Sequence, residues 1–144
     1  MDITHGKYLA VDYGDKRTGL AECDLSGMLA SGLGTIREGG MRNTAVRVAK
    51  EATSRSCKKI IVGLPRNMDG TEGERAKPVR AFVDILSTLV DIPIEFYDER
   101  LTTMVAYRYL GATETYGKKR KESFDTLSAE IILQDYLNFE KNKK

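Results

Sequence analysis

The chain has 144 residues, 13 of them glycine and 3 of them proline, a length that fits one domain with a buried core. Its 23 basic and 21 acidic residues leave a net charge of only +2, so charge alone assigns no partner. The two cysteines, Cys23 and Cys57, lie far apart in the sequence and His5 is the only histidine, which excludes a zinc site built from these residue types.

No apolar run approaches the roughly 20 residues that span a bilayer, and residues 1–7 lack the hydrophobic segment of a secretory signal. We therefore expect a cytoplasmic protein that does not bind membranes. It should form a single domain over residues 1–144, with flexible ends at 1–6 and 140–144.

Short apolar runs between turn residues predict five strands. These are Tyr8–Val11, Thr18–Cys23, Leu29–Ile36, Ile60–Leu64 and Ile94–Tyr97. Apolar spacing and capping residues predict four helices. They begin at Asn43, near Arg75 to Lys77 (ending about Val90), at Thr102 or Thr103 (ending before Gly111), and at Ser123 (ending about Phe139).

Short turns join the first three predicted strands, which favours an antiparallel meander, whereas helical crossovers make the first, fourth and fifth strands parallel. The predicted fold class is therefore α/β. Its mixed five-stranded sheet has three antiparallel strands followed by two parallel ones, and helices flank it. Residues 111–122 should form a flexible segment between the last two helices.

Acidic residues follow two of the parallel strands. Asp12 ends the first strand, and Asp98 and Glu99 come directly after the fifth. Parallel strands end at the same edge of a sheet, which is where open α/β sheets bind ligands. One of Asp98 and Glu99 should therefore point toward Asp12.

Asp125 lies on the apolar stripe of the last helix, within roughly 20° of Ile132 around the helix axis. A carboxylate on that stripe faces the sheet and needs a partner. The helix dipole or an arginine, Arg17 or Arg100, could supply a purely structural partner. A functional role for Asp125 stays equally open on this evidence.

Three acids that converge at one edge cannot all stay ionised without a cation. Oxygen ligands without histidine favour Mg²⁺ or Mn²⁺. Two such ions about 4 Å apart would stabilise the attacking and leaving oxygens of a phosphodiester, so the pattern predicts a two-metal-ion nuclease. The bound ions would also favour contact with a phosphate backbone.

Four sequence segments together resemble one family. They are Leu9-Ala10-Val11-Asp12-Tyr13-Gly14 with Lys16-Arg17, Ile61-Val62-Gly63-Leu64-Pro65 with Asn67-Met68-Asp69-Gly70, Asp98-Glu99-Arg100-Leu101-Thr102, and Asp125-Thr126-Leu127-Ser128-Ala129. In this order and spacing they resemble the YqgF/RuvX family, described as pre-16S ribosomal RNA nucleases and as Holliday-junction resolvase-like proteins. The resemblance covers about residues 7 to 137.

The resemblance implies an RNase H-like fold and a catalytic site of Asp12, Glu99 and Asp125, which would bind the metal ions with Asp98 as a further candidate ligand. It also implies a cytoplasmic bacterial enzyme that trims the 5′ end of the small-subunit ribosomal RNA precursor. In many RNase H-like nucleases the second acid follows the fourth strand. Here Gly63, Leu64 and Pro65 hold that place.

Basic and polar residues near these acids are candidates for nucleic-acid binding. They are Lys16, Arg17, Arg66, Asn67, Arg100, Lys118, Lys119, Arg120 and Lys121. Gly14 would permit a positive φ behind Asp12.

The leading hypothesis is a nuclease for structured RNA such as pre-16S ribosomal RNA, acting alone or on ribosomal particles. The alternatives are a nuclease for branched DNA, which would need a dimer, and an RNA-binding factor without catalysis. We expect a monomer or weak homodimer. Nucleotide binding of the sugar-kinase type is disfavoured, because those enzymes close a cleft between two such domains.

Overall fold

A computed structural model describes residues 5–37, 39–99 and 117–142, and for 117–125 it describes the helix but not the side chains. The elements in chain order are β1 (Tyr8–Asp12), β2 (Thr18–Cys23), β3 (Ala30–Ile36), α1 (Met41–Ser54), β4 (Lys59–Leu64), α2 (Ala76–Ser87), β5 (Ile94–Asp98) and α4 (Gly117–Asn142). The helix expected from Thr102 or Thr103 lies outside the described residues.

The strands form one five-stranded sheet in the order β3-β2-β1-β4-β5. β2 pairs antiparallel with both β1 and β3, whereas β4 pairs parallel with β1 and β5. The predicted mixed sheet is confirmed, and each strand begins and ends within one residue of its predicted bounds. β1 lies at the centre of the sheet, and its residues Tyr8–Val11 are buried.

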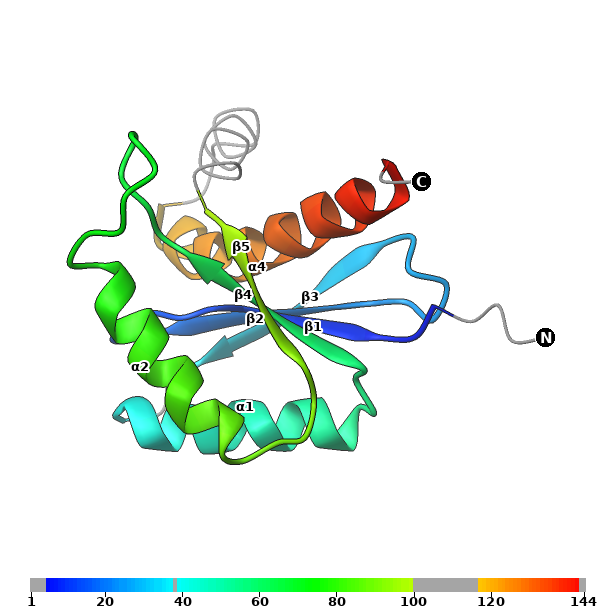
Figure 1. Cartoon of the computed structure of the whole chain (residues 1–144), viewed down its shortest axis with the longest axis horizontal. Helices are drawn as coiled ribbons and strands as arrows, with labels where there is room; N and C mark the ends of the chain where they lie inside the picture. Colours follow the sequence, from blue (N-terminus) through cyan, green and yellow to red (C-terminus); the bar gives the residue numbers. More distant parts are fainter. Residues whose placement is uncertain (1–4, 38, 100–116, 143–144) are drawn as a thin grey trace.

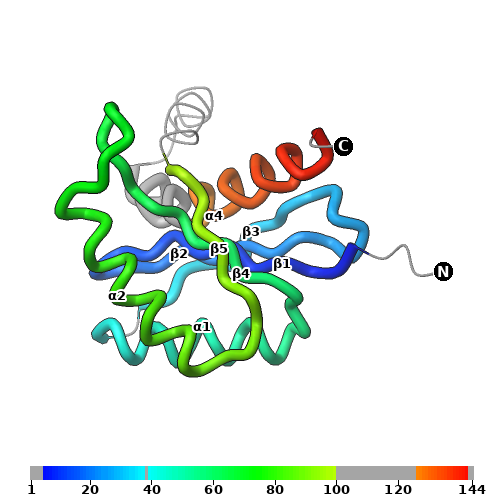
Figure 2. Tube along the Cα trace, viewed as in Figure 1, coloured from blue at the N-terminus to red at the C-terminus, as the bar shows by residue number. Residues whose placement is uncertain are grey.

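Helices cover both faces of the sheet, with α1 and α2 on one side and α4 on the other (Figures 1 and 2). Alternate residues of a strand point to opposite faces. Leu9 and Val11 of β1 therefore pack in the core beside α1 and α2, whereas Tyr8 and Ala10 pack in the core beneath α4. The same alternation determines whether Asp98 or Glu99 lies on the same face as Asp12.

Two helices begin elsewhere than predicted. α1 starts at Met41, and the Asn43 side chain donates to Gly39 O at 2.7 Å from within the helix. α4 starts at Gly117 rather than Ser123, so residues 118–121 belong to a helix and not to a flexible segment. Lysine and arginine are good helix formers, which explains why the helix continues through this basic run.

Candidate active site

Asp12 and Glu99 meet at the carboxyl edge of the sheet. Asp12 is the last residue of β1, and Glu99 follows β5, where its backbone N–H donates to Leu64 O at 3.0 Å and so continues the pairing with β4. Their side chains are hydrogen-bonded to each other. Because two carboxylates cannot bond without a proton or a cation between them, this pair is a place for a positive charge.

Strand alternation explains why Glu99, and not Asp98, faces Asp12. In β5, Phe96 packs beside α1 and α2, whereas Tyr97 packs beneath α4. By the same alternation Asp98 points to the first face and Glu99 to the second. On the first face, Asp98 Oδ2 lies 4.0 Å from Arg66 Nε.

Gly63 of β4 makes room for the Glu99 carboxylate. A Cβ at Gly63 would lie 3.0 Å from Glu99 Oε2 and 2.8 Å from Ile132 Cδ1 of α4. The glycine therefore lets Glu99 lie over β4, next to the end of β1. This gives a physical reason why an acid after β5 can take the place of one after β4.

The surroundings of Glu99 shift its ionisation. Burial raises the pKa of Glu99, the positive charge of Arg75 and the hydrogen bond with Asp12 lower it, and the negative charge of Asp98 raises it again. The net effect is a pKa above the ordinary value of a glutamate. Arg75, the residue before α2, is a charged neighbour that the sequence pattern did not reveal, because it lies 24 residues from Glu99.

The side chain of Asp125 lies outside the described set, but its neighbour Thr126 is described. Thr126 Oγ1 is hydrogen-bonded to Thr35 Oγ1 of β3 at 3.1 Å. Thr35 pairs with Gly19, and Gly19 pairs with Asp12. The backbone of α4 therefore crosses the sheet at the level of Asp12 where it carries Asp125.

Asp12, Glu99 and Asp98 do not by themselves complete a metal site. Among the side chains that the structure describes, no three acidic, histidine or cysteine residues converge closely enough to hold a metal ion. Asp12 and Glu99 nevertheless fit a hard divalent ion, because they offer oxygen ligands and already bond to each other. Further oxygen ligands would have to come from elsewhere.

Some of the residues expected to bind nucleic acid lie at this edge of the sheet. The turn from β1 to β2 carries Lys16, which is exposed, and Arg17, which is half-buried. Gly14 in this turn does not use the positive φ that a glycine permits. A Cβ there would lie 2.5 Å from Arg17 O, so the glycine is needed for close approach of the backbone.

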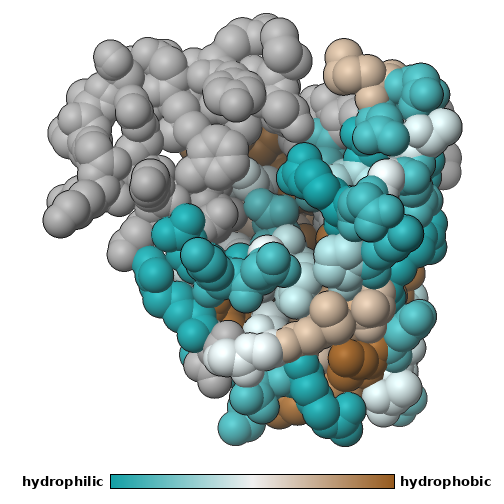
Figure 3. Space-filling model, turned by 90° about the vertical axis from the view of Figure 1, so that its left-hand side faces the viewer, coloured by the Kyte–Doolittle hydropathy of each residue, from teal (hydrophilic) through white to brown (hydrophobic). Residues whose placement is uncertain are grey.

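The loop after β4 holds Arg66 and Asn67. Arg66 Nη1 donates to Gly70 O at 3.0 Å, and Asn67 Nδ2 donates to Thr71 Oγ1 at 3.0 Å, so both side chains brace the loop. Arg100 and the side chains of 118–121 lie outside the described set. Figure 3 turns this edge toward the viewer, and the part of its surface that belongs to described residues is mainly hydrophilic with a few apolar spots.

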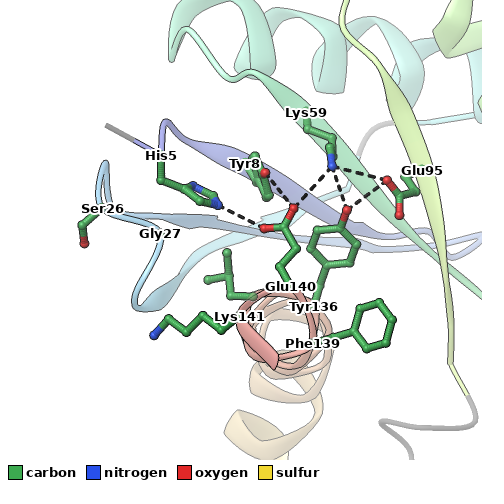
Figure 4. Close-up of a pocket in the computed structure, with 11 residues that line it drawn as sticks. His5, Tyr8, Ser26, Gly27, Lys59, Glu95, Tyr136, Phe139, Glu140 and Lys141 are labelled. Carbon is green, nitrogen blue, oxygen red and sulfur yellow. Dashed lines mark hydrogen bonds and ion pairs between the residues drawn. The ribbon is translucent and has the colours of Figure 1, made fainter. Parts of the chain in front are cut away.

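A second polar cluster lies at the opposite edge of the sheet, beside a pocket of about 700 Å³ (Figure 4). Glu140 of α4 is hydrogen-bonded to His5 at 3.1 Å and accepts a hydrogen bond from Tyr8 at 3.0 Å. Lys59 Nζ donates to Tyr136 Oη at 2.7 Å and lies 3.6 Å from Glu140 Oε2. His5 and Glu140, both in ends expected to be flexible, are thus joined, and the cluster fastens α4 to β1 and β4.

The mixed sheet in the order β3-β2-β1-β4-β5, with helices on both faces, is an RNase H-like fold. Thermus thermophilus RuvC, solved in complex with a Holliday junction substrate, is similar with a TM-score of 0.59 and 13% identity, over 89% of this chain and 92% of that chain. The human cytomegalovirus terminase nuclease domain is similar with a TM-score of 0.51 and 13% identity, over 94% and 84% of the two chains. At such identities these likenesses show the fold.

Sequence comparison gives the family. The RuvX profile, described as Holliday junction resolvase, matches residues 6–139, and the chain belongs to this family. A Thermoanaerobacter pseudethanolicus protein named "Putative pre-16S rRNA nuclease" is 42% identical over 138 residues, which cover 95% of this chain and 99% of that protein. A Clostridioides difficile protein of the same name is 38% identical, over 95% of this chain and 97% of that protein.

Within the described ranges, none of the helices combines the length and the apolar character needed to cross a bilayer.

Proposed function

We propose that this protein is a metal-dependent endonuclease that hydrolyses RNA phosphodiester bonds and processes the 5′ end of pre-16S ribosomal RNA in the cytoplasm. The family and the names of the relatives support nuclease activity and this substrate. The structural observation that carries the proposal is the contact between the Asp12 and Glu99 carboxyls at the ligand-binding edge of the sheet.

In this proposal Asp12, Glu99 and Asp125 hold Mg²⁺ or Mn²⁺, with Asp98 as a further candidate ligand. The course of α4 supports Asp125, because Thr126 bonds to β3 at the level of Asp12. Two ions at this site would activate a water molecule and stabilise the leaving oxygen. The positive charge of the ions would offset the repulsion between the neighbouring Asp12 and Glu99 carboxylates.

Basic residues around the edge would bind the phosphate backbone. Lys16, Arg17 and Arg66 lie in turns that leave the sheet beside Asp12 and Asp98. Asn67 braces the same loop as Arg66. Arg100 and residues 118–121 complete the proposed set, and the protein acts on free precursor RNA or on ribosomal particles, as a monomer or weak homodimer.

The test is cleavage of an end-labelled RNA that spans the precursor 5′ leader, with Mn²⁺ or with EDTA. Wild type should make defined cuts only with the metal ion. Asp12→Asn should make none, whereas Asp91→Asn, which changes an exposed acid before β5, should cut like wild type. Equal cleavage by Asp12→Asn and wild type would refute the proposed site, and tight RNA binding without any cleavage would favour a binding factor.

A second candidate is cleavage of branched DNA, favoured by the description of the family as Holliday junction resolvase. Symmetric cutting of a four-way junction needs two active sites related by a two-fold axis. The same variants assayed on a synthetic junction, together with the sedimentation behaviour of the complex, decide between the substrates. Paired symmetric cuts by a dimer would establish the DNA function.

A further inference from the structure

Met68 is the most exposed of the large apolar side chains that the structure describes, with 92% of its surface accessible. It lies in the loop between β4 and α2, which projects beyond the carboxyl end of β4 (Figure 1). A single exposed apolar residue is common on protein surfaces. Met68 differs from an ordinary exposed apolar residue in two respects: its loop is held by internal hydrogen bonds, and the loop lies beside the proposed active site.

The polar side chains of the loop are used to brace the loop itself. Asp69 Oδ1 accepts hydrogen bonds from Thr71 N at 3.0 Å and from Thr71 Oγ1 at 2.7 Å. Asn67 N donates to Thr71 O at 2.8 Å, and Gly70 N donates to Asn67 O at 2.9 Å. The loop is therefore shaped before any ligand arrives, so that little conformational freedom is lost when it binds.

The base of the loop is joined to the proposed active site. Leu64 O accepts the hydrogen bond from Glu99 N, and Arg66 lies 4.0 Å from Asp98. Met68 is four residues along the chain from Leu64, and four steps of an extended chain span at most about 14 Å. Met68 therefore lies within about 14 Å of Leu64, a distance that corresponds to about four steps of 3.4 Å along a stacked duplex, so it is close enough to contact a nucleotide near the proposed site.

We propose that Met68 packs against an unpaired or unstacked nucleobase close to the cleaved bond, and so selects substrates by their structure rather than by their sequence. Apolar side chains can insert between bases and partly unstack them. The thioether is polarisable and unbranched, and it has no strong donor or acceptor with which to distinguish one base from another. This inference rests on the proposed nuclease function, because it takes the Asp12 edge as the place where nucleic acid binds.

The experiment compares two RNAs of equal length, one with a bulged 2-aminopurine and one with the same base in a continuous duplex. Binding is measured with EDTA present, so that no cleavage occurs. Met68→Ala should lose about tenfold in affinity for the bulged RNA and less than about twofold for the duplex, because the lost contact is apolar and local. Met68→Leu should retain most of the affinity.

Met28→Ala is the matched control, because Met28 is also exposed, at 50%, but lies in the turn between β2 and β3 at the opposite edge of the sheet. It should bind both RNAs like wild type. Wild type should raise the 2-aminopurine fluorescence of the bulged RNA as the base unstacks, and Met68→Ala should not. Thermal melts check that all variants fold.

Equal losses of affinity for both RNAs in Met68→Ala would overturn the inference. No loss of affinity would also overturn it, and a protein partner would then be the better explanation of the exposed side chain. Cleavage with Mn²⁺ separates this inference from the proposed function. If wild type cuts neither RNA but the affinity loss is specific to the bulge, the nuclease proposal fails and the role of Met68 holds. If wild type and Met68→Ala cut both RNAs equally, the nuclease proposal holds and the proposed role of Met68 fails.

Discussion

The Tyr8 hydroxyl donates a 3.0 Å hydrogen bond to Glu140 Oε2 across 132 residues of sequence, joining the first strand to the last helix. Glu140 is also hydrogen-bonded to His5, and Lys59 lies close to it (Figure 4). Glu140 lies near the end of α4, and Asp125 lies near its beginning. The contact therefore helps to hold α4 in position along the sheet.

Glu140→Gln should lower the free energy of unfolding by about 1 to 2 kcal/mol, because it weakens hydrogen bonds to a charged acceptor. Glu74→Gln is the control. Glu74 is 88% exposed and paired only with the neighbouring Lys77 in the described part of the chain, so this change should have no measurable effect. Urea unfolding of both variants tests the prediction, and equal stabilities would show that the cluster around Glu140 contributes nothing.

Stability should fall at alkaline pH in a way that depends on Tyr8. Burial and the hydrogen bond with Glu140 raise the pKa of Tyr8 from 10.0 to about 12. The folded state thus holds the phenol proton more tightly than the unfolded state. The contribution of Tyr8 is fully present below pH 10 and is lost as the pH rises toward 12.

Urea unfolding from pH 9 to pH 12 of wild type and Tyr8→Phe measures this loss, since the variant lacks the titrating group. The stability difference between the two proteins should shrink as the pH rises from about 10 to about 12. A constant difference over this range would contradict the assignment.

Gly63→Ala should reduce both nuclease activity and stability. The added Cβ would lie 3.0 Å from Glu99 Oε2 and would displace this carboxylate from Asp12. Displacements of about 1 Å in an active site can cost about a hundredfold in rate. Overpacking against Ile132 should cost about 1 to 3 kcal/mol.

Gly39→Ala is the control for this variant, because no atom lies within 4 Å of where its Cβ would be. Cleavage rates and urea unfolding of both proteins test the prediction. Full activity in Gly63→Ala would show that the position of Glu99 does not matter for the reaction.

Asp12→Asn should leave the fold intact and abolish stabilisation by Mn²⁺. An ion that binds only the folded protein raises its melting temperature, and this effect needs the carboxylate. In EDTA the variant should be at least as stable as wild type, because one of two neighbouring carboxylates has lost its charge. Melting curves with Mn²⁺ and with EDTA test this, and a large loss of stability in EDTA would favour a structural role for Asp12.

The sequence by itself determined the strands, their order of appearance and their directions. Apolar runs such as Tyr8–Val11 are bounded by polar residues and glycines, and the length of each connection decides between hairpin and crossover. It also placed Asp12 and the pair Asp98 and Glu99 at one edge of the sheet. These features depend on local pattern and chain length, which a sequence displays directly.

Only the tertiary structure decided which acid meets Asp12. Alternation predicts that Asp98 and Glu99 point to opposite faces, but it does not say which face α4 covers. That depends on packing between distant segments, in which Gly63 leaves space for Glu99 beneath α4. Arg75 near Glu99 and Glu140 beside Tyr8 are contacts of the same kind, because side chains far apart in sequence become neighbours only when the sheet and helices have packed.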